Sequence, residues 1–188
     1  MGGYIFKFIF IFLIIVFIVP IQLVQAETVP ATICNGVEII TAESTVVINE
    51  IQTNGIGSGT TDQEFVELKN TGQEVVDISG WKLRYITSSG NYIVPSQTSQ
   101  TPQYFVTFPG GTFLQAGGFI LAAPVTYTDL TSTPKFTYAA SYNLAATGGS
   151  VALVNATGIA VDVVGWGSVA TTCRETTLVP APAGGSSI

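Results

Sequence analysis

The chain has 188 residues, of which 47% are hydrophobic and only 10% are charged, and it contains no histidine. The abundant Thr, Ser, Val and Gly favour a β-rich extracellular protein over a helical cytosolic one, and the missing histidine excludes histidine-dependent triads and most zinc sites. The net charge of −6, with six scattered basic residues, argues against binding to nucleic acid or to an anionic membrane surface.

Residues 1–26 have the layout of a secretory signal peptide. Lys7 gives a weakly positive start, residues 8–19 form an unbroken apolar run, and Ala26 ends a small-residue cleavage site. The alternative is an uncleaved membrane anchor over residues 4–24, a window long enough to span a bilayer if Lys7 snorkels. Either interpretation places the body of the protein outside the cytoplasm, secreted or at the cell surface, with membrane contact only through this segment.

The two cysteines are Cys34, in an extension formed by residues 27–45, and Cys173. In an exported protein they are expected to form a disulfide, whose closed loop is worth about 4–5 kcal/mol in the chain-entropy model. Two free thiols are the alternative in a reducing compartment. A catalytic cysteine is not expected, because no histidine is present to activate it.

Residues 46–170 are predicted to form the folded domain, after a short edge strand at residues 37–40. The first confident strand, residues 46–51, is expected to place Val46, Ile48 and Glu50 on one face and the residues between them on the other. A loop rich in Gly and polar residues follows at residues 53–62 and belongs on the surface.

The central stretch, residues 65–85, consists of three predicted strands joined by two tight turns. Its first strand should direct Val66 and Leu68 into the core and the residues between them outward. Turns are expected at residues 70–72 and 79–80, because Asn and Gly tolerate the positive φ of a reversal. After a short strand at residues 75–78, the last strand alternates Trp81, Leu83 and Tyr85 against Lys82 and Arg84.

Short predicted strands continue through the second half, at residues 104–108, 112–114, 119–122, 151–154 and 159–165. The polar stretch 88–102 is a surface loop or a loop with one edge strand at residues 92–94, and residues 124–141 are a long connection with little periodicity. The last two strands form the clearest hairpin, with Gly158 in the left-handed position of the turn. Residues 171–188 are a Pro/Gly/Ser-rich tail, expected to be disordered or a linker.

Short strands at intervals of about 8–12 residues, with turn signals between them, predict one all-β domain built as an antiparallel sandwich. Five stretches in this order resemble the lamin tail domain family, with no single one diagnostic. They are VINE at residues 47–50, EFVELKN at residues 64–70, ISGWKL at residues 78–83, FLQAGGF at residues 113–119, and residues 151–162.

The resemblance, which covers residues 46–167, implies an immunoglobulin-like β-sandwich of the exported bacterial type. It also implies a non-catalytic module that binds partners or tethers, often beside hydrolase or adhesion domains. Two features depart from the nuclear members: the chain has no coiled-coil heptads, and its acidic balance gives no support for chromatin binding. The positions that match the family pattern and are expected to be structural are Asn49, Glu50, Phe65, Glu67, Asn70, Gly80, Trp81, Gly117 and Gly158.

Four carboxylates form the one acidic cluster in the sequence: Glu50, Asp62, Glu64 and Glu67. Paired carboxylates can hydrolyse glycosides, and oxygen ligands can hold Ca²⁺. A structural role is favoured, because two of the four fall on family-pattern positions and the loop at residues 53–64 lacks the spacing of a known calcium loop. No catalytic, cofactor-binding or metal-binding residue is therefore assigned.

Three other features have simpler structural explanations than functional ones. Ser132 and Lys135 fit a Ser-x-x-Lys pattern, but Pro134 disfavours the helical turn that this chemistry needs. Trp81 is expected in the core, whereas Trp166 is either core or a sugar-stacking surface. Asn155-Ala156-Thr157 has the form of a glycosylation sequon, which has meaning only in a host with that machinery.

Three functions remain as hypotheses at this point. The first is an exported or cell-surface sandwich domain that binds or tethers an unknown protein or envelope component, without a cofactor or catalysis. The second is an accessory module of a larger extracellular hydrolase or nuclease. The third is a small hydrolase that uses Glu50, Glu64 or Glu67.

Overall fold

The computed structural model describes residues 32–34, 37–39, 44–57, 60–89, 104–128, 132–169, 173–174 and 179–188, with backbone only for the first two segments. In these residues the regular structure is strands and one turn of 3-10 helix, η1 (Thr61–Gln63). The strands are β1 (Thr32–Cys34), β2 (Val37–Ile39), β3 (Val46–Gln52), β4 (Phe65–Asn70), β5 (Val76–Asp77), β6 (Lys82–Thr87), β7 (Tyr104–Thr107), β8 (Phe113–Leu114), β9 (Phe119–Pro124), β10 (Phe136–Tyr138), β11 (Gly148–Val154) and β12 (Ala160–Gly167).

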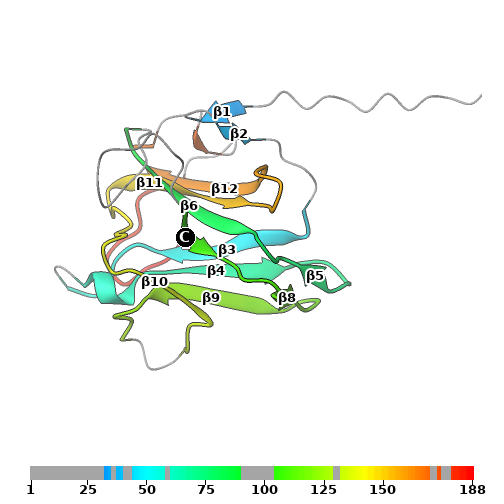
Figure 1. Ribbon diagram of the computed structural model, residues 1–188. Helices are drawn as coiled ribbons and strands as arrows, with labels where there is room; N and C mark the ends of the chain where they lie inside the picture. Colours follow the sequence, from blue (N-terminus) through cyan, green and yellow to red (C-terminus); the bar gives the residue numbers. More distant parts are fainter. Residues whose placement is uncertain are drawn as a thin grey trace, which may run out of the picture.

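Two main sheets stack as layers, which confirms the predicted all-β sandwich (Figure 1). The larger sheet has the strand order β1-β2-β12-β11-β6-β7, and the smaller has the order β10-β9-β4-β3. A two-stranded sheet of β5 and β8 lies at one end. Neighbouring strands are antiparallel except for β10 beside β9 and a single parallel bridge from β12 to β2.

The main core lies between the two sheets and contains the inward side chains that the strand periodicity predicts. Val66 and Leu68 of β4 are fully buried against the facing sheet, where Leu83 and Leu153 are fully buried too. The alternation of β4 is as expected, since Phe65, Glu67 and Lys69 between the inward positions are only partly buried. Burial of such side chains, at about 1.5–3 kcal/mol each, is the main stabilising contribution to the sandwich.

Strand β6 departs from the predicted alternation, because it is buried on both of its faces. Arg84 is as buried as Leu83, and Tyr85 and Ile86 are buried as well. A second apolar cluster covers the outer face of this sheet, which turns a half-buried strand into a fully buried one. Its buried members are Ile86, Ala152, Val154, Ala160, Val163, Val169 and Cys173.

The predicted facing of β3 is wrong beyond Ile48. The register with β4 shifts between Ile48 and Glu50, and this β-bulge inserts Asn49 as an extra, exposed residue. The bulge reverses which side chains turn inward, so that Val46, Ile48 and Ile51 are all buried and Glu50 is not. A one-residue bulge cannot be recognised from the alternation of side chains in one strand, because it is defined by the register with the partner strand.

Of the two tryptophans, Trp166 is more deeply buried than Trp81, contrary to expectation. Trp166, left undecided by the sequence, is completely buried, stacks on Tyr85 at a centroid distance of 6.0 Å, and donates from Nε1 to the Ala145 carbonyl oxygen at 2.9 Å. Trp81, expected in the core, is partly buried and packs against the edge of the main cluster. Trp166 is therefore a structural residue and not a sugar-stacking surface.

Two segments predicted to lack regular structure are ordered. The connection at residues 124–141 contains β10, which pairs in parallel with β9 from Phe136↔Ala122 to Tyr138↔Pro124. Within the tail, Val179 pairs with Trp166 and Ser187 pairs with Gln52, so the segment 179–188 is not a disordered linker. The start of the predicted surface loop is also inside, since Thr53 is only 2% exposed.

Other expectations fall on parts of the chain outside the described residues. The signal or anchor segment 1–26 and the possible strand at residues 92–94 lie there, and the described residues contain no helix of membrane-spanning length and hydropathy. Cys173 is buried and bears no free thiol, whereas the side chain of Cys34 is outside the described part. The Cys34–Cys173 pairing stays a prediction.

Candidate functional site

The four carboxylates do not converge on one site. Glu50 and Glu67 face each other across β3 and β4 on the outer face of the smaller sheet, where Glu67 accepts a 2.7 Å hydrogen bond from Asn49. Asp62 lies in η1 and accepts from the Thr128 hydroxyl at 3.1 Å. Glu64 is buried. Among the described residues, no three Asp, Glu, Cys or His side chains are grouped to hold a metal ion.

Glu64 instead forms part of an internal polar cluster. Its Oε2 accepts from the Leu144 backbone N–H at 3.1 Å, while its buried Oε1 has no hydrogen-bond partner. Tyr85 accepts at its hydroxyl from the Ala145 N–H at 2.9 Å. Burial raises the pKa of Glu64 to about 8, so this carboxyl is mainly protonated at neutral pH. The hydrogen-bond partner of Glu64 is a backbone N–H and not a second carboxylate, as is typical of a structural residue.

The end of the sandwich near β5 and β8 is organised around Asn70, the last residue of β4. Asn70 is fully buried, and its Nδ2 donates to the carbonyl oxygens of Glu74 at 2.7 Å and Leu114 at 3.1 Å. Its Oδ1 accepts from the Gly72 N–H at 2.9 Å, and its main chain bonds Gly117 and Gly118 at 3.0 Å each. One side chain therefore ties the turn after β4 to the turn between β8 and β9.

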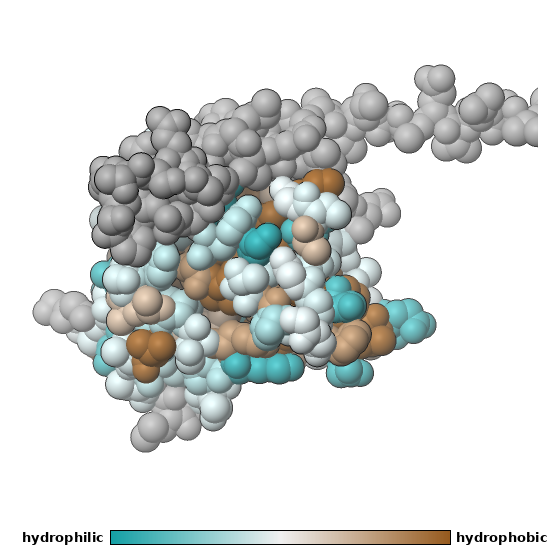
Figure 2. All heavy atoms as spheres, in the orientation of Figure 1, coloured by the Kyte–Doolittle hydropathy of each residue, from teal (hydrophilic) through white to brown (hydrophobic). Residues whose placement is uncertain are grey.

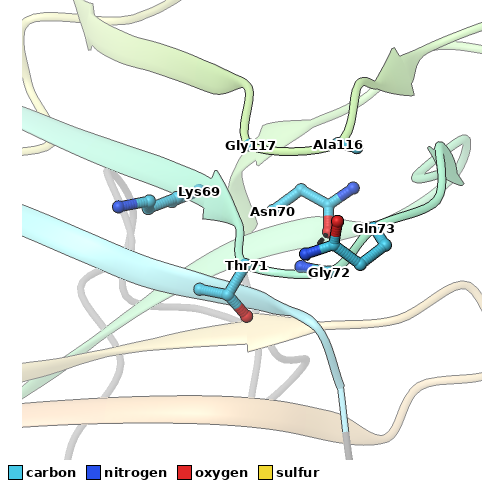
Figure 3. A pocket seen from close by; sticks show the side chains of 7 residues that line it. All are labelled: Lys69, Asn70, Thr71, Gly72, Gln73, Ala116 and Gly117. Atoms are coloured by element: carbon cyan, nitrogen blue, oxygen red, sulfur yellow. Dashed lines mark hydrogen bonds between the residues drawn. The ribbon is translucent and has the colours of Figure 1, made fainter.

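A hollow of about 380 Å³ lies between these two turns. Figure 3 shows the Asn70 and Gln73 side chains between the turns, with Ala116 and Gly117 facing them and Lys69 pointing away along β4. Gly117 has φ +67°, which lets the facing turn reverse tightly. The residues that line the hollow are Lys69, Asn70, Thr71, Gly72, Gln73, Ala116 and Gly117.

Three large apolar side chains are exposed on the segments that flank the two turns in the chain. Val75, directly before β5, is 51% exposed, Phe113 of β8 is 49% exposed, and Phe119, at the start of β9, is 52% exposed. Figure 2 shows apolar atoms on the surface at this end of the molecule. The Lys69 ammonium lies 5.0 Å from the centre of the Phe119 ring, which adds a cation–π contact at the rim. We call this surface, made of the hollow and these three side chains, the Asn70 end.

Clustered exposed apolar groups beside polar groups are typical of binding surfaces. The Lamin Tail Domain family model matches residues 40–168. The chain belongs to the Lamin Tail Domain family. The family is a non-enzymatic, immunoglobulin-like domain, in agreement with this end of the sandwich. A search of curated proteins finds no match to the chain.

The positions of the Lamin Tail Domain pattern divide into three structural roles. Gly80, Gly117 and Gly158 sit in turns with φ of +74°, +67° and +90°. Asn49, Glu50, Phe65 and Glu67 lie on the outer face of the smaller sheet, exposed or half-buried. Asn70 belongs to the Asn70 end, where its contacts build the hollow, and Trp81 directly precedes β6.

Sequence reasoning missed the lining residues Thr71, Gln73 and Ala116 and the exposed Val75 and Phe113. Their signal was present only as apolar residues next to turn residues, which is also common in ordinary hairpins. The Ser-x-x-Lys pattern and the sequon also have structural positions. Ser132 and Lys135 lie on a non-helical segment, and the Asn155 Oδ1 accepts from the Thr157 N–H, the Thr157 hydroxyl and the Ile159 N–H in a tight turn.

Proposed function

We propose that this chain is a non-catalytic binding domain of an exported protein, and that it recognises a protein partner through the Asn70 end. The observation that carries the proposal is the exposure of Val75, Phe113 and Phe119 on the segments that flank a hollow whose walls are fixed by Asn70. Scattered exposed apolar residues are normal on a protein surface, but three of them beside a concave polar site are typical of an interface.

The rigidity of the Asn70 end supports binding without a large ordering cost. Both turns are held by the side-chain amide of Asn70 and by main-chain bonds, so the apolar side chains project from a fixed frame. A preorganised surface loses less conformational entropy when a partner docks than a mobile loop does. Phe113 and Phe119 are suitable anchors, because aromatic side chains are enriched among residues that dominate binding energy.

Export is the second part of the proposal. The support is the layout of residues 1–26, with one basic residue, an apolar run and Ala26 at a small-residue cleavage site. Expression of the whole chain in its host, followed by fractionation and N-terminal sequencing, tests this. A mature extracytoplasmic chain that begins at Glu27 is expected, whereas a cytoplasmic chain that keeps its N-terminus would refute export.

The binding proposal is tested by quantitative capture of envelope proteins with the mature domain and matched variants. Phe119→Ser removes an anchor, and Ala116→Arg places a long side chain at the hollow from an exposed position. Val125→Ser is the control, because Val125 is exposed to a similar degree but lies beyond the opposite end of β9. A partner retained by the wild type and the control but lost from both site variants is expected. Equal capture by all four proteins would refute the site.

A further inference from the structure

Strand β3 is an edge strand of the smaller sheet, yet each N–H group that it directs away from β4 has a partner. The Val46 N–H donates to the Ser44 hydroxyl at 3.1 Å, the Ile48 N–H to the Asp162 carboxylate, and the Ile51 N–H to the Ile188 carbonyl oxygen at 2.8 Å. Open edges are templates for pairing with another chain, and proteins cover them to prevent it. The first two partners are side chains; the third is the backbone of another segment of the chain, which forms an isolated bridge with β3.

This other segment is the C-terminal segment. The Ile188 N–H donates back to the Ile51 carbonyl oxygen at 3.0 Å, Ser187 pairs with Gln52, and the Gly185 N–H donates to the Asn54 carbonyl oxygen at 2.9 Å. Figure 1 places the C-terminus beside β3, away from the β5–β8 end. The segment thus completes the sheet at the far end of β3 from Asn70.

The segment is held mainly through its backbone. Residues 183–187 are exposed, and Ile188 is the one apolar side chain among residues 184–188, partly buried against the core. Few buried apolar contacts place a segment at the low-stability end of a fold, where local opening is frequent. The β3 edge is therefore an acceptor whose resident segment can leave while the rest of the sandwich stays folded.

The β3 edge is selective for the sequence of the C-terminal segment. Gly185 has φ +78°, and a Cβ there would come within 2.3 Å of Ile56 Cγ1; a Cβ on Gly184 would lie 2.9 Å from the Gly55 carbonyl oxygen. The edge fits two successive glycines with an aliphatic residue, here Ile188, three positions after the second. A generic peptide lacks that pattern, whereas every copy of this chain carries it.

We propose that the β3 edge is a binding site for the C-terminal segment of a second copy of this chain, so that two copies exchange residues 184–188. The exchanged segment makes the same bonds to Ile51 and Asn54 as it makes within one chain, which is the low-cost route to a dimer called domain swapping. The proposal goes beyond the proposed function, because it uses a different surface and a different partner from the Asn70 end.

The test uses a variant that ends after residue 178 and a synthetic peptide of residues 179–188, with binding measured by isothermal titration calorimetry. Two N-methylated peptides are a matched pair. Methylation at Ile188 removes the donor to Ile51, whereas methylation at Ser187 alters an N–H that has no hydrogen bond to any described residue. Saturable binding is expected, weakened about tenfold or more by N-methyl-Ile188 or Gly185→Ala and unchanged by N-methyl-Ser187.

Weaker binding of the peptide to the intact chain than to the shortened one supports the proposal, because the intact chain carries its own segment. If the shortened chain folds only when the peptide is added, as judged by circular dichroism, that supports it too. No binding, or equal binding of the two methylated peptides, overturns it. Light scattering of the intact chain after warming and cooling should show a dimer fraction; a strictly monomeric chain at all concentrations also overturns the proposal.

Discussion

The side-chain amide of Asn70 donates a hydrogen bond to the backbone carbonyl oxygen of Leu114, 44 residues further along the chain, at 3.1 Å. This bond joins the smaller sheet to the β5–β8 sheet and fixes the wall of the hollow at the Asn70 end. The carbonyl oxygen of Glu74 accepts from the same nitrogen at 2.7 Å. The candidate interface thus depends on one buried amide, and changes at that amide should affect stability and binding together.

Replacing Asn70 by alanine is expected to destabilise the domain by about 2–3 kcal/mol, because the buried Leu114 carbonyl oxygen loses its donor and the bond to Glu74 is lost as well. Urea unfolding followed by fluorescence measures the loss. Asn49→Ala is the matched control: Asn49 is exposed and donates to Glu67 on the outer face, so its loss should cost less than about 1 kcal/mol. Equal losses for the two variants would contradict the role of Asn70.

Glu64 predicts a specific pH dependence of stability. Burial raises its pKa from 4.5 to about 8 in the folded protein, so between these values the unfolded chain loses a proton that the folded chain keeps. The burial of Glu64 therefore lowers the free energy of unfolding most at pH 8 and above, and this penalty disappears below pH 4.5. Glu64→Gln removes that penalty while keeping the shape of the side chain.

The melting temperature measured from pH 4 to pH 9 tests this dependence. The Glu64→Gln variant should gain little over wild type at pH 4 and increasingly more toward pH 8, by about 2–4 °C for each kcal/mol. Glu67→Gln is the control for the loss of one negative charge, because Glu67 lies on the outer face of β4. A gain that is the same at pH 4 and pH 8 would show that desolvation of Glu64 is not its cause.

The two tryptophans should differ in fluorescence and in their contribution to stability. Trp166→Phe removes the donor to the Ala145 carbonyl oxygen and shrinks a completely buried side chain, at a cost of about 2–3 kcal/mol. Trp81→Phe affects a partly buried residue and should cost less. The chain that keeps only Trp166 should emit at shorter wavelength than the chain that keeps only Trp81; the reverse order would contradict their placement.

The Cys34–Cys173 disulfide is tested by thiol titration and by peptide mapping of the mature protein without reductant. No free thiol and one cross-linked peptide pair are expected, and reduction should destabilise the domain by up to about 4–5 kcal/mol. Cys34→Ser and Cys173→Ser should each behave like the reduced protein. Two titratable thiols in the folded, exported chain would refute the pairing.

Much of the sandwich could be predicted from side-chain alternation alone. Val66 and Leu68 face the core as expected, and the hairpin around Gly158 has the expected positive φ. The errors arise where burial depends on contacts distant in sequence. The bulge at Asn49 is visible only against β4, and the burial of Arg84 depends on a second apolar cluster that covers its sheet.

The candidate site was predictable only in part, for the same reason. Asn70 and Gly117 were recognised as pattern positions, but their shared hollow exists because two turns 44 residues apart meet. The ordered tail was missed because Pro, Gly and Ser composition is typical of linkers, whereas this segment is held by main-chain bonds that composition does not report. Trp166 lies between two glycines and gave no periodic signal.

The most direct test of binding through the Asn70 end is site-specific photo-crosslinking in the host. A photoreactive phenylalanine analogue is placed at Phe113 or Phe119, and in a control chain at Val125, which follows β9 about 20 Å along the strand from Phe119. Positions 113 and 119 are predicted to capture one and the same partner protein, and position 125 to capture none of it. Capture at position 125 alone, or no discrete product at 113 and 119, would contradict the account.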